Sequence, residues 1–308
     1  MDNRAGGRSL PHIHDIQIRD PFVLREKDMY YLFGSTDKDI WRSAAVGFDM
    51  YRSKGNLEEF EGPFPCFRPP ENFWSAINFW APEVYRYRGE YYMFATFKPR
   101  EGCRGTAVLK SPSPEEPFLP WSAGPLTPPE WECLDGTFYV DGEGKPWMIF
   151  CHEWVQVGNG EICLIPLAED LKTAAGGPRL LFRAAEAPWA RPLPERPGRP
   201  SPAYVTDGPN MYTAENGDLL MLWSSFNEQH RYCIGLARSE SGLVTGPWKQ
   251  SEKPLYEADG GHGMFFRSLE GALYLALHSP NKTPQERPVF IEFTDDRGLI
   301  RRGERIIA

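Results

Sequence analysis

A short pattern of apolar segments recurs five times along this chain of 308 residues. Each copy begins with a small or polar residue followed by Pro or Gly, and continues with an apolar segment, a tight turn and a second apolar segment. The copies start near positions 20, 81, 135, 207 and 262, so they lie 54 to 72 residues apart. A repeat of this length built only from strands is typical of a β-propeller, in which each copy forms one blade. The sequence therefore predicts an all-β, five-bladed propeller.

Turn residues separate the two apolar segments of each copy. Arg88-Gly89, Asn216-Gly217 and Glu270-Gly271 are of the kind that close β-hairpins. A second hairpin follows the first, as in TAVLKSP (106–112) and YCIGLARS (232–239). We therefore expect about four antiparallel strands per blade. Because the copies cover almost the whole sequence, we expect a single propeller domain over residues 1–308.

Charge and cysteine content narrow the classes of partner and the compartment. The net charge is −8 and no long basic run occurs, which argues against binding to nucleic acid or to anionic membrane surfaces. No stretch approaches the ~18 apolar residues of a membrane span, and the first residues contain no apolar core of a signal peptide. The six cysteines show no close pairing, and three lie in apolar runs: Cys151, Cys163 and Cys233. We therefore expect a cytoplasmic protein with free thiols and no disulfides.

Three copies begin with an aspartate, and these residues are candidates for catalysis. Asp20, Asp135 and Asp207 occupy the same position in the aligned repeat, which predicts that their side chains converge on the propeller axis. The competing interpretation is that the Asp-Gly pairs at 135 and 207 are ordinary turn residues. Two carboxyl groups across a cleft can hydrolyse a glycoside, one as a proton donor and the other as a base. A third carboxylate nearby would keep the donor protonated by repulsion.

These motifs, in this order, resemble those of glycoside hydrolase family 43, five-bladed propeller enzymes acting on arabinose- and xylose-containing glycans. The resemblance covers roughly residues 15 to 280 and rests on five segments: IRDPFV, FWAPEVY, LDGTFYVDGEGKPWMIF, DGPNMY and DGGHGMFF. It implies an inverting mechanism with Asp20 as general base. It also implies that Asp135 tunes the acid and orients the sugar.

The general acid stays open at this point, because the resemblance fails at one residue. The family has Glu in an E-G-P or E-A-P motif, whereas this chain has Asp207 in TDGP. Asp207 is one methylene shorter, and small misplacements of a proton donor are costly. Glu153, in FCHEW, is therefore the slightly favoured acid, and Asp207 with a shifted substrate is the alternative. Glu83 is a weaker candidate, with hydrogen bonding in the second blade as its other role. A third outcome is loss of hydrolysis with sugar binding retained.

Further residues are expected to bind sugar because the topology places them on the same face. Strand ends supply His152, Ser225 and His278. Trp74 and Trp80 lie on the long connection 68–80, where they either pack between blades or form a platform for a sugar ring. The Pro-rich connection 183–204 is either a stiff spacer or a loop at the rim of the pocket. The resemblance further implies a central calcium or sodium ion near His262, with no cofactor required for the chemistry.

The sequence thus predicts an inverting glycosidase, exo-acting on α-L-arabinofuranosides or β-xylosides of short oligosaccharides. The alternative from another class is a carbohydrate-binding propeller that no longer hydrolyses its ligand.

Overall fold

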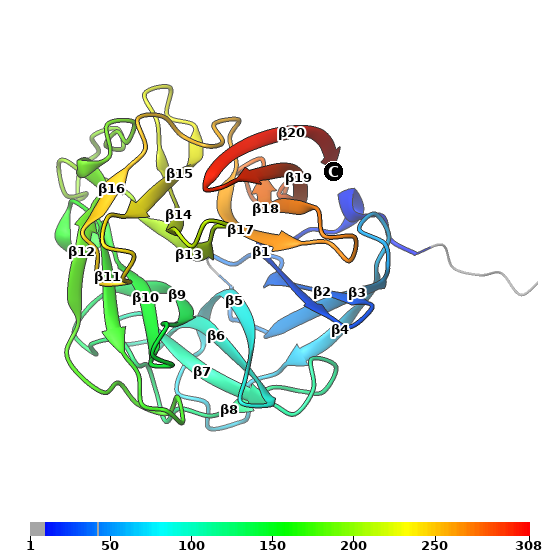
Figure 1. Ribbon diagram of the computed structural model, residues 1–308. Helices are drawn as coiled ribbons and strands as arrows, with labels where there is room; N and C mark the ends of the chain where they lie inside the picture. The colour runs from blue at the N-terminus through cyan, green and yellow to red at the C-terminus, as the bar shows by residue number, and fades with distance from the viewer. Residues whose placement is uncertain (1–9, 42) are drawn as a thin grey trace, which may run out of the picture.

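The computed structural model describes residues 10–41 and 43–308, which form five four-stranded antiparallel sheets around a central axis (Figure 1). Blade 1 contains β1 (Arg19–Glu26), β2 (Met29–Ser35), β3 (Phe48–Lys54) and β4 (Glu61–Phe67). Blade 2 contains β5 (Ile77–Tyr87), β6 (Glu90–Lys98), β7 (Gly105–Ser111) and β8 (Leu119–Pro120). Blade 3 contains β9 (Cys133–Val140), β10 (Pro146–His152), β11 (Glu161–Pro166) and β12 (Arg179–Arg183). The predicted fold class is confirmed.

The last two blades follow the same plan, and the helical segments are short. Blade 4 contains β13 (Asp207–Thr213), β14 (Leu219–Phe226), β15 (Tyr232–Ser239) and β16 (Trp248–Gln250). Blade 5 contains β17 (Gly261–Arg267), β18 (Leu273–Ser279), β19 (Arg287–Asp296) and β20 (Leu299–Ile307). The helical segments are η1 (Ile13–Asp15), α1 (Trp154–Val157) and η2 (Ala184–Glu186). Within the described residues, no helix has the length and apolar character needed to cross a membrane.

The ring closes by contact between its first and last blades. The innermost strands are β1, β5, β9, β13 and β17, and β1 contacts both β5 and β17. Neighbouring blades cover both faces of each sheet, and apolar side chains fill the space between them. Between blades 1 and 2, for example, the rings of Phe48, Phe67, Phe79 and Phe97 pack within 6.0 Å of one another. Cys151, Cys163 and Cys233 are buried as predicted, and all six cysteines have free thiols.

Each innermost strand carries a β-bulge whose first residue has a positive φ, and we call this the axial residue. The axial residues are Asp20 (φ 56°), Ala81 (46°), Asp135 (56°), Gly208 (48°) and His262 (51°). The left-handed conformation favours Gly and tolerates Asp. In blade 4 the position belongs to Gly208, where a Cβ would meet the His262 ring at 2.7 Å. The prediction that the three aspartates occupy equivalent positions is therefore wrong for Asp207. In Asp135-Gly136 the aspartate is the axial residue, whereas in Asp207-Gly208 the glycine is.

Hydrogen bonds link neighbouring blades at the axial residues, and we call them inter-blade latches. In a latch, the N–H of an axial residue donates to a side chain on the second strand of the preceding blade. Four junctions have one: Ala81 to Ser35 Oγ (2.9 Å), Asp135 to Thr96 Oγ1 (2.8 Å), His262 to Ser224 Oγ (2.9 Å) and Asp20 to His278 Nδ1 (3.2 Å). The last of these closes the ring between blades 5 and 1. Because these N–H groups are buried, each latch satisfies a donor that water does not reach.

Candidate active site

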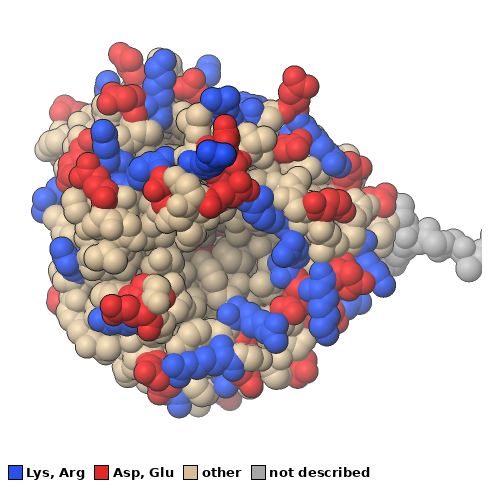
Figure 2. Space-filling model, in the orientation of Figure 1, with Lys and Arg blue, Asp and Glu red and all other residues tan. Residues whose placement is uncertain are grey.

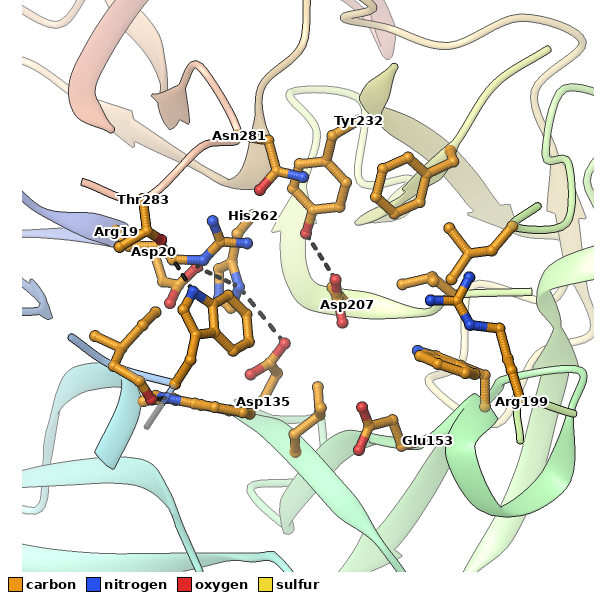
Figure 3. A pocket seen from close by; sticks show the side chains of 18 residues that line it. Arg19, Asp20, Asp135, Glu153, Arg199, Asp207, Tyr232, His262, Asn281 and Thr283 are labelled. Atoms are coloured by element: carbon orange, nitrogen blue, oxygen red, sulfur yellow. Dashed lines mark hydrogen bonds and ion pairs between the residues drawn. The ribbon is translucent and has the colours of Figure 1, made fainter. Parts of the chain in front are cut away.

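A pocket of about 530 Å³ opens at the axis and receives side chains from all five blades (Figure 3). This volume is in the range that binds a small molecule. The space-filling view shows charged residues of both signs around a hollow at the centre of the propeller (Figure 2). The pocket contains three candidate catalytic carboxyl groups from the inner strands, Asp20, Asp135 and Asp207, together with Glu153 from the end of β10.

In four of the five blades, the residue just before the axial residue lines the wall of the pocket. Arg19, Trp80, Leu134 and Asp207 occupy this position in blades 1 to 4, and all four line the pocket. In blade 5 the position is Gly261, where a Cβ would lie 2.1 Å from Cε1 of Tyr232. Gly261 therefore leaves space for the Tyr232 ring. Asp207 belongs to this wall, whereas Asp20 and Asp135 belong to the axial layer, the ring formed by the five axial residues.

Asp20 is held in its ionised form. Its carboxylate accepts a hydrogen bond from Ser35 Oγ (2.7 Å) and lies 3.3 Å from His262 Nδ1 and 3.6 Å from Arg19 Nε. Burial alone would raise the pKa of Asp20. The charges of His262 and Arg19 and the Ser35 bond outweigh burial and lower this pKa below its ordinary value. An ionised carboxylate in the pocket is suited to act as a base.

Asp135 and Asp207 form a coupled pair that retains a proton. Burial, followed by repulsion from Asp20, raises the pKa of Asp135 to about 8. Burial, followed by repulsion from Asp135, raises the pKa of Asp207 to about 7. Each ionised carboxylate disfavours the ionisation of the other, because two negative charges in one buried pocket repel. The pair therefore holds a proton near neutral pH that a general acid can donate.

The hydrogen bonds around the pair favour the proton on Asp207. Asp135 Oδ2 accepts the backbone N–H of Gly208 (2.9 Å) and lies 3.5 Å from His262 Nδ1, and both contacts favour a negative charge there. Asp207 Oδ2 accepts the hydroxyl hydrogen of Tyr232 (3.0 Å), which leaves its other oxygen without this partner (Figure 3). Asp135 has the higher pKa of the two, about 8 against about 7, so the pair shares one proton, and the smaller number of donors at Asp207 leaves it an oxygen that can carry this proton in the pocket.

Glu153 lies in the same pocket but has a cationic partner. It precedes α1 and makes an ion pair with Nη1 of Arg104, whose guanidinium lies 4.6 Å from the centre of the Trp80 ring. Burial raises the pKa of Glu153, and Arg104 opposes this rise. A carboxylate paired with Arg is a weaker proton donor than one paired with another carboxylate.

Trp80 lines the pocket as predicted, but other expected sugar-binding residues lie outside the pocket lining. Trp74 packs against Phe97 between blades 1 and 2. His152 stacks on Trp131 and bonds Glu161 and Gln156. Ser225 is fully buried, and its hydroxyl has no partner.

His278 and Glu83 also have structural partners instead of facing the pocket. His278 is fully buried and accepts the Asp20 latch, and burial lowers its pKa well below the ordinary value, so it is neutral. Glu83 is buried and accepts a hydrogen bond from Tyr85, and burial raises its pKa to about 7. This matches the alternative given for Glu83, hydrogen bonding in blade 2.

An ion near His262 stays a prediction. In residues 10–41 and 43–308, no group of three or more His, Cys, Asp or Glu side chains is arranged to hold a metal. The Nδ1 atom of His262 contacts Asp20 and Asp135 instead. These three side chains contact one another and do not form a cation site by themselves.

Several pocket residues were missed by the sequence reasoning. Arg19 precedes Asp20 in the IRDPFV segment and was available from the motif. Tyr232 comes from a third strand, β15, and reaches Asp207 only because Gly261 has no side chain. Trp41, half exposed on the β2–β3 connection, donates its indole N–H to Thr283 Oγ1 (3.0 Å) and lies 5.1 Å from Trp80.

The Pro-rich connection contributes to the pocket wall, as in the second of its two predicted roles. Leu193 and Arg199 line the pocket from this segment. The backbone N–H of Leu193 donates to Ala203 (2.7 Å), and the guanidinium of Arg199 lies 5.1 Å from the Trp154 ring. These contacts fix the loop over the side of the pocket formed by blade 3.

Comparison with known proteins identifies relatives along most of the chain. The family model described as glycosyl hydrolases family 43 matches residues 13–295. An extracellular exo-α-(1→5)-L-arabinofuranosidase of Streptomyces chartreusis is 24% identical over 82% of this chain and 75% of its own length. A protein of the same name from Cellvibrio japonicus is 25% identical over 52% of this chain and only 46% of its own length. The solved structure of an endo-arabinase from Bacteroides thetaiotaomicron is 41% identical, with TM-score 0.85, and covers 92% of this chain and 96% of its own.

These relatives correct one prediction. Both curated relatives are named extracellular, which contradicts the expected cytoplasmic location. The expectation depended in part on residues 1–9, which lie outside the described residues. The expectation also depended on free thiols. A buried thiol without a second cysteine in reach stays free inside or outside the cell, so free thiols do not define the compartment.

Proposed function

The chain belongs to glycosyl hydrolase family 43, and from this premise we propose that it hydrolyses α-L-arabinofuranosides with inversion at the anomeric carbon. The family membership confirms the prediction of a glycosidase. The observation that carries the finer proposal is the division of charge in the pocket. Asp20 is ionised, whereas Asp207 shares a proton with Asp135.

The proposed reaction uses these two states directly. Ionised Asp20 takes a proton from a water molecule as the water oxygen attacks the anomeric carbon. Protonated Asp207 gives its proton to the glycosidic oxygen as the bond from carbon to that oxygen breaks. The products are a free sugar of inverted configuration and an alcohol. Water attack from the opposite face follows from using Asp20 as a base rather than as a nucleophile.

Asp135 supports the donor without touching the leaving group. Repulsion between the two carboxyl groups keeps one proton on the pair until the glycosidic oxygen accepts it from Asp207. After reaction, the pair recovers a proton from solvent, while Asp20 releases the one it took. Asp207 therefore replaces Glu153 as the proposed acid, because Asp207 faces a carboxylate and Glu153 faces Arg104.

The pocket supports small furanosides as substrates and release from a chain end. Trp41 and Trp80 line the pocket, and indole rings pack well against the C–H face of a sugar ring. The Pro-rich connection narrows the blade-3 side, which favours a pocket over an open groove. Both curated relatives are named exo-acting arabinofuranosidases. Internal cleavage is the second candidate, because the 41% identical structure is named an endo-arabinase.

Three measurements test the proposal. The first is turnover of 4-nitrophenyl α-L-arabinofuranoside, with 4-nitrophenyl β-xyloside as the comparison; no turnover of either would leave a binding protein. The second is proton NMR of the first product formed, in which a retained anomeric configuration would exclude inversion. The third is product analysis on linear arabino-oligosaccharides, which gives only the monosaccharide for exo action and mixed lengths for endo action.

Asp20→Asn is the matched variant for these assays. It keeps the shape of the side chain and removes the base, so turnover is expected to fall by roughly 10²–10⁴-fold. Substrate binding, measured by titration calorimetry, is expected to persist. Full activity of this variant would remove Asp20 from the mechanism.

A further inference from the structure

One junction of the propeller lacks its inter-blade latch. The latch acceptors Ser35, Thr96, Ser224 and His278 each pair with the residue before the axial residue of their own blade. In blade 3 the residue in this register is Cys151, which pairs with Leu134. Cys151 has a thiol, a much weaker hydrogen-bond acceptor than a hydroxyl or an imidazole nitrogen.

The backbone N–H at this junction bonds to a catalytic carboxylate instead. Gly208 is the axial residue of blade 4, and its N–H donates to Asp135 Oδ2 at 2.9 Å. The other four axial N–H groups are engaged by their latches. Gly208 directly follows Asp207 in the chain. The bond therefore ties the carboxylate of Asp135 to the backbone that carries Asp207.

From this exception we propose that Cys151 is a positioning residue: by not accepting the Gly208 N–H, it leaves that donor to orient Asp135 against Asp207. The inference rests on the proposed function for its consequence in catalysis, but the hydrogen bond itself is independent of that function. The Cys151 side chain is fully buried in the interface between blades 3 and 4. A serine or threonine there would restore the latch found at three other junctions. Asp135 would then lose its backbone donor.

The neighbourhood of Cys151 is consistent with a neutral group at this position. Burial raises the pKa of the Cys151 thiol well above its ordinary value, and Asp135 and Asp207 raise it further. A thiol that stays protonated adds no charge to the carboxyl pair. It also fills the volume of a hydroxyl-bearing side chain without competing for the donor.

The key variant is Cys151→Ser, with Cys233→Ser as the matched control. Cys233 is also fully buried, and its Sγ donates to the carbonyl of Ser225 (3.3 Å), a bond that a serine hydroxyl can make. We expect Cys151→Ser to lower kcat on an arabinofuranoside by tenfold or more with little change in KM. Cys233→Ser is expected to keep the kcat of the unmodified enzyme.

The pH profile supplies a readout that a purely structural role would not move. Without the Gly208 donor, the ionised form of Asp135 is less stable, so the pair keeps its proton to higher pH. The basic limb of the kcat profile should therefore shift upward in Cys151→Ser. The charged groups that face Asp135 are the same in both proteins: Asp20, Arg19, Asp207, Glu83, Glu153 and His262.

A direct probe separates this proposal from the proposed function. In the unmodified protein, the amide proton of Gly208 should shift in NMR spectra as the carboxyl pair titrates. The shift should be lost in Cys151→Ser and kept in Cys151→Ala, because alanine cannot accept the N–H. If Cys151→Ser retains the titrating Gly208 amide and the original pH profile, the proposal is overturned. An enzyme inactive on every glycoside would overturn only the proposed function, since the amide titration needs no turnover.

Discussion

The hydroxyl of Tyr232 donates to Oδ2 of Asp207 at 3.0 Å, across a gap that exists because Gly261 has no side chain. Tyr232 is the first residue of β15, the third strand of blade 4, and its side chain lines the pocket. The ring also stacks on His278 at 5.7 Å, which ties it to blade 5. Asp207 is therefore oriented by a phenol held from both sides.

Tyr232→Phe should weaken proton donation without emptying this space. The ring remains, but Asp207 loses the donor that fixes its orientation. We expect kcat to fall by roughly 10–100-fold on a substrate with a poor leaving group, and by much less on a 4-nitrophenyl glycoside. Steady-state kinetics on both substrates measures the difference. An equal loss on both would mean that Tyr232 acts on the sugar rather than on the acid.

The identity of the acid can be decided by two isosteric variants. Asp207→Asn removes the proposed donor, so hydrolysis of an unactivated oligosaccharide should fall by roughly 10²–10⁴-fold, with a smaller loss on the 4-nitrophenyl glycoside. Glu153→Gln breaks the ion pair with Arg104 and should lower both activities by a similar factor. The reverse pattern, with leaving-group dependence only in Glu153→Gln, would make Glu153 the acid.

The fivefold architecture was predictable because it depends on features that every copy displays. Apolar segments, glycine-containing turns and regular spacing are each visible in the sequence. The positions of Asp20 and Asp135 at the axis followed from the same pattern. Both occupy the left-handed position of a bulge, as their shared place in the repeat implied.

The register of Asp207 was not predictable from the pattern, because a bulge adds one residue without a distinct sequence mark. Asp135-Gly136 and Asp207-Gly208 look alike, yet the left-handed residue is Asp135 in one and Gly208 in the other. Tyr232 and Trp41 were missed for a related reason. A third strand and a loop reach the pocket only through the packing of several blades, which no single repeat shows.

The stability of the protein should fall as pH rises through the titration of the pocket. The pKa of Asp207 is raised to about 7 by burial and by Asp135. Between pH 4 and 7 the folded state therefore binds more protons than the unfolded state, so ionisation of Asp207 costs stability as pH increases. Asp207→Asn should match the unmodified protein near pH 4 and exceed it by on the order of 1–4 kcal/mol at pH 8. Urea denaturation at both pH values measures this.

Asp141→Asn is the control with the opposite sign. Although burial opposes it, the Trp147 N–H and backbone donors lower the pKa of Asp141, so its ionised form stabilises the fold above the unfolded pKa. This variant should be less stable than the unmodified protein at pH 8, and the difference should shrink as pH falls below 4. If Asp207→Asn also lowers the free energy of unfolding at pH 8, ionisation of the buried carboxyl pair does not destabilise the fold.

Two adjacent serines test whether the inter-blade latches hold the axial layer together. Ser224 Oγ accepts the N–H of His262 at 2.9 Å, whereas Ser225 Oγ is equally buried and has no partner. Ser224→Ala leaves a buried N–H unsatisfied and should lower the free energy of unfolding by about 1–3 kcal/mol. Because His262 contacts both Asp20 and Asp135, kcat should fall as well.

Ser225→Ala removes an unpaired hydroxyl and should be neutral or slightly stabilising, with unchanged kcat. Denaturation midpoints and kcat for the two variants are directly comparable, and equal effects would show that the latch contributes nothing beyond packing.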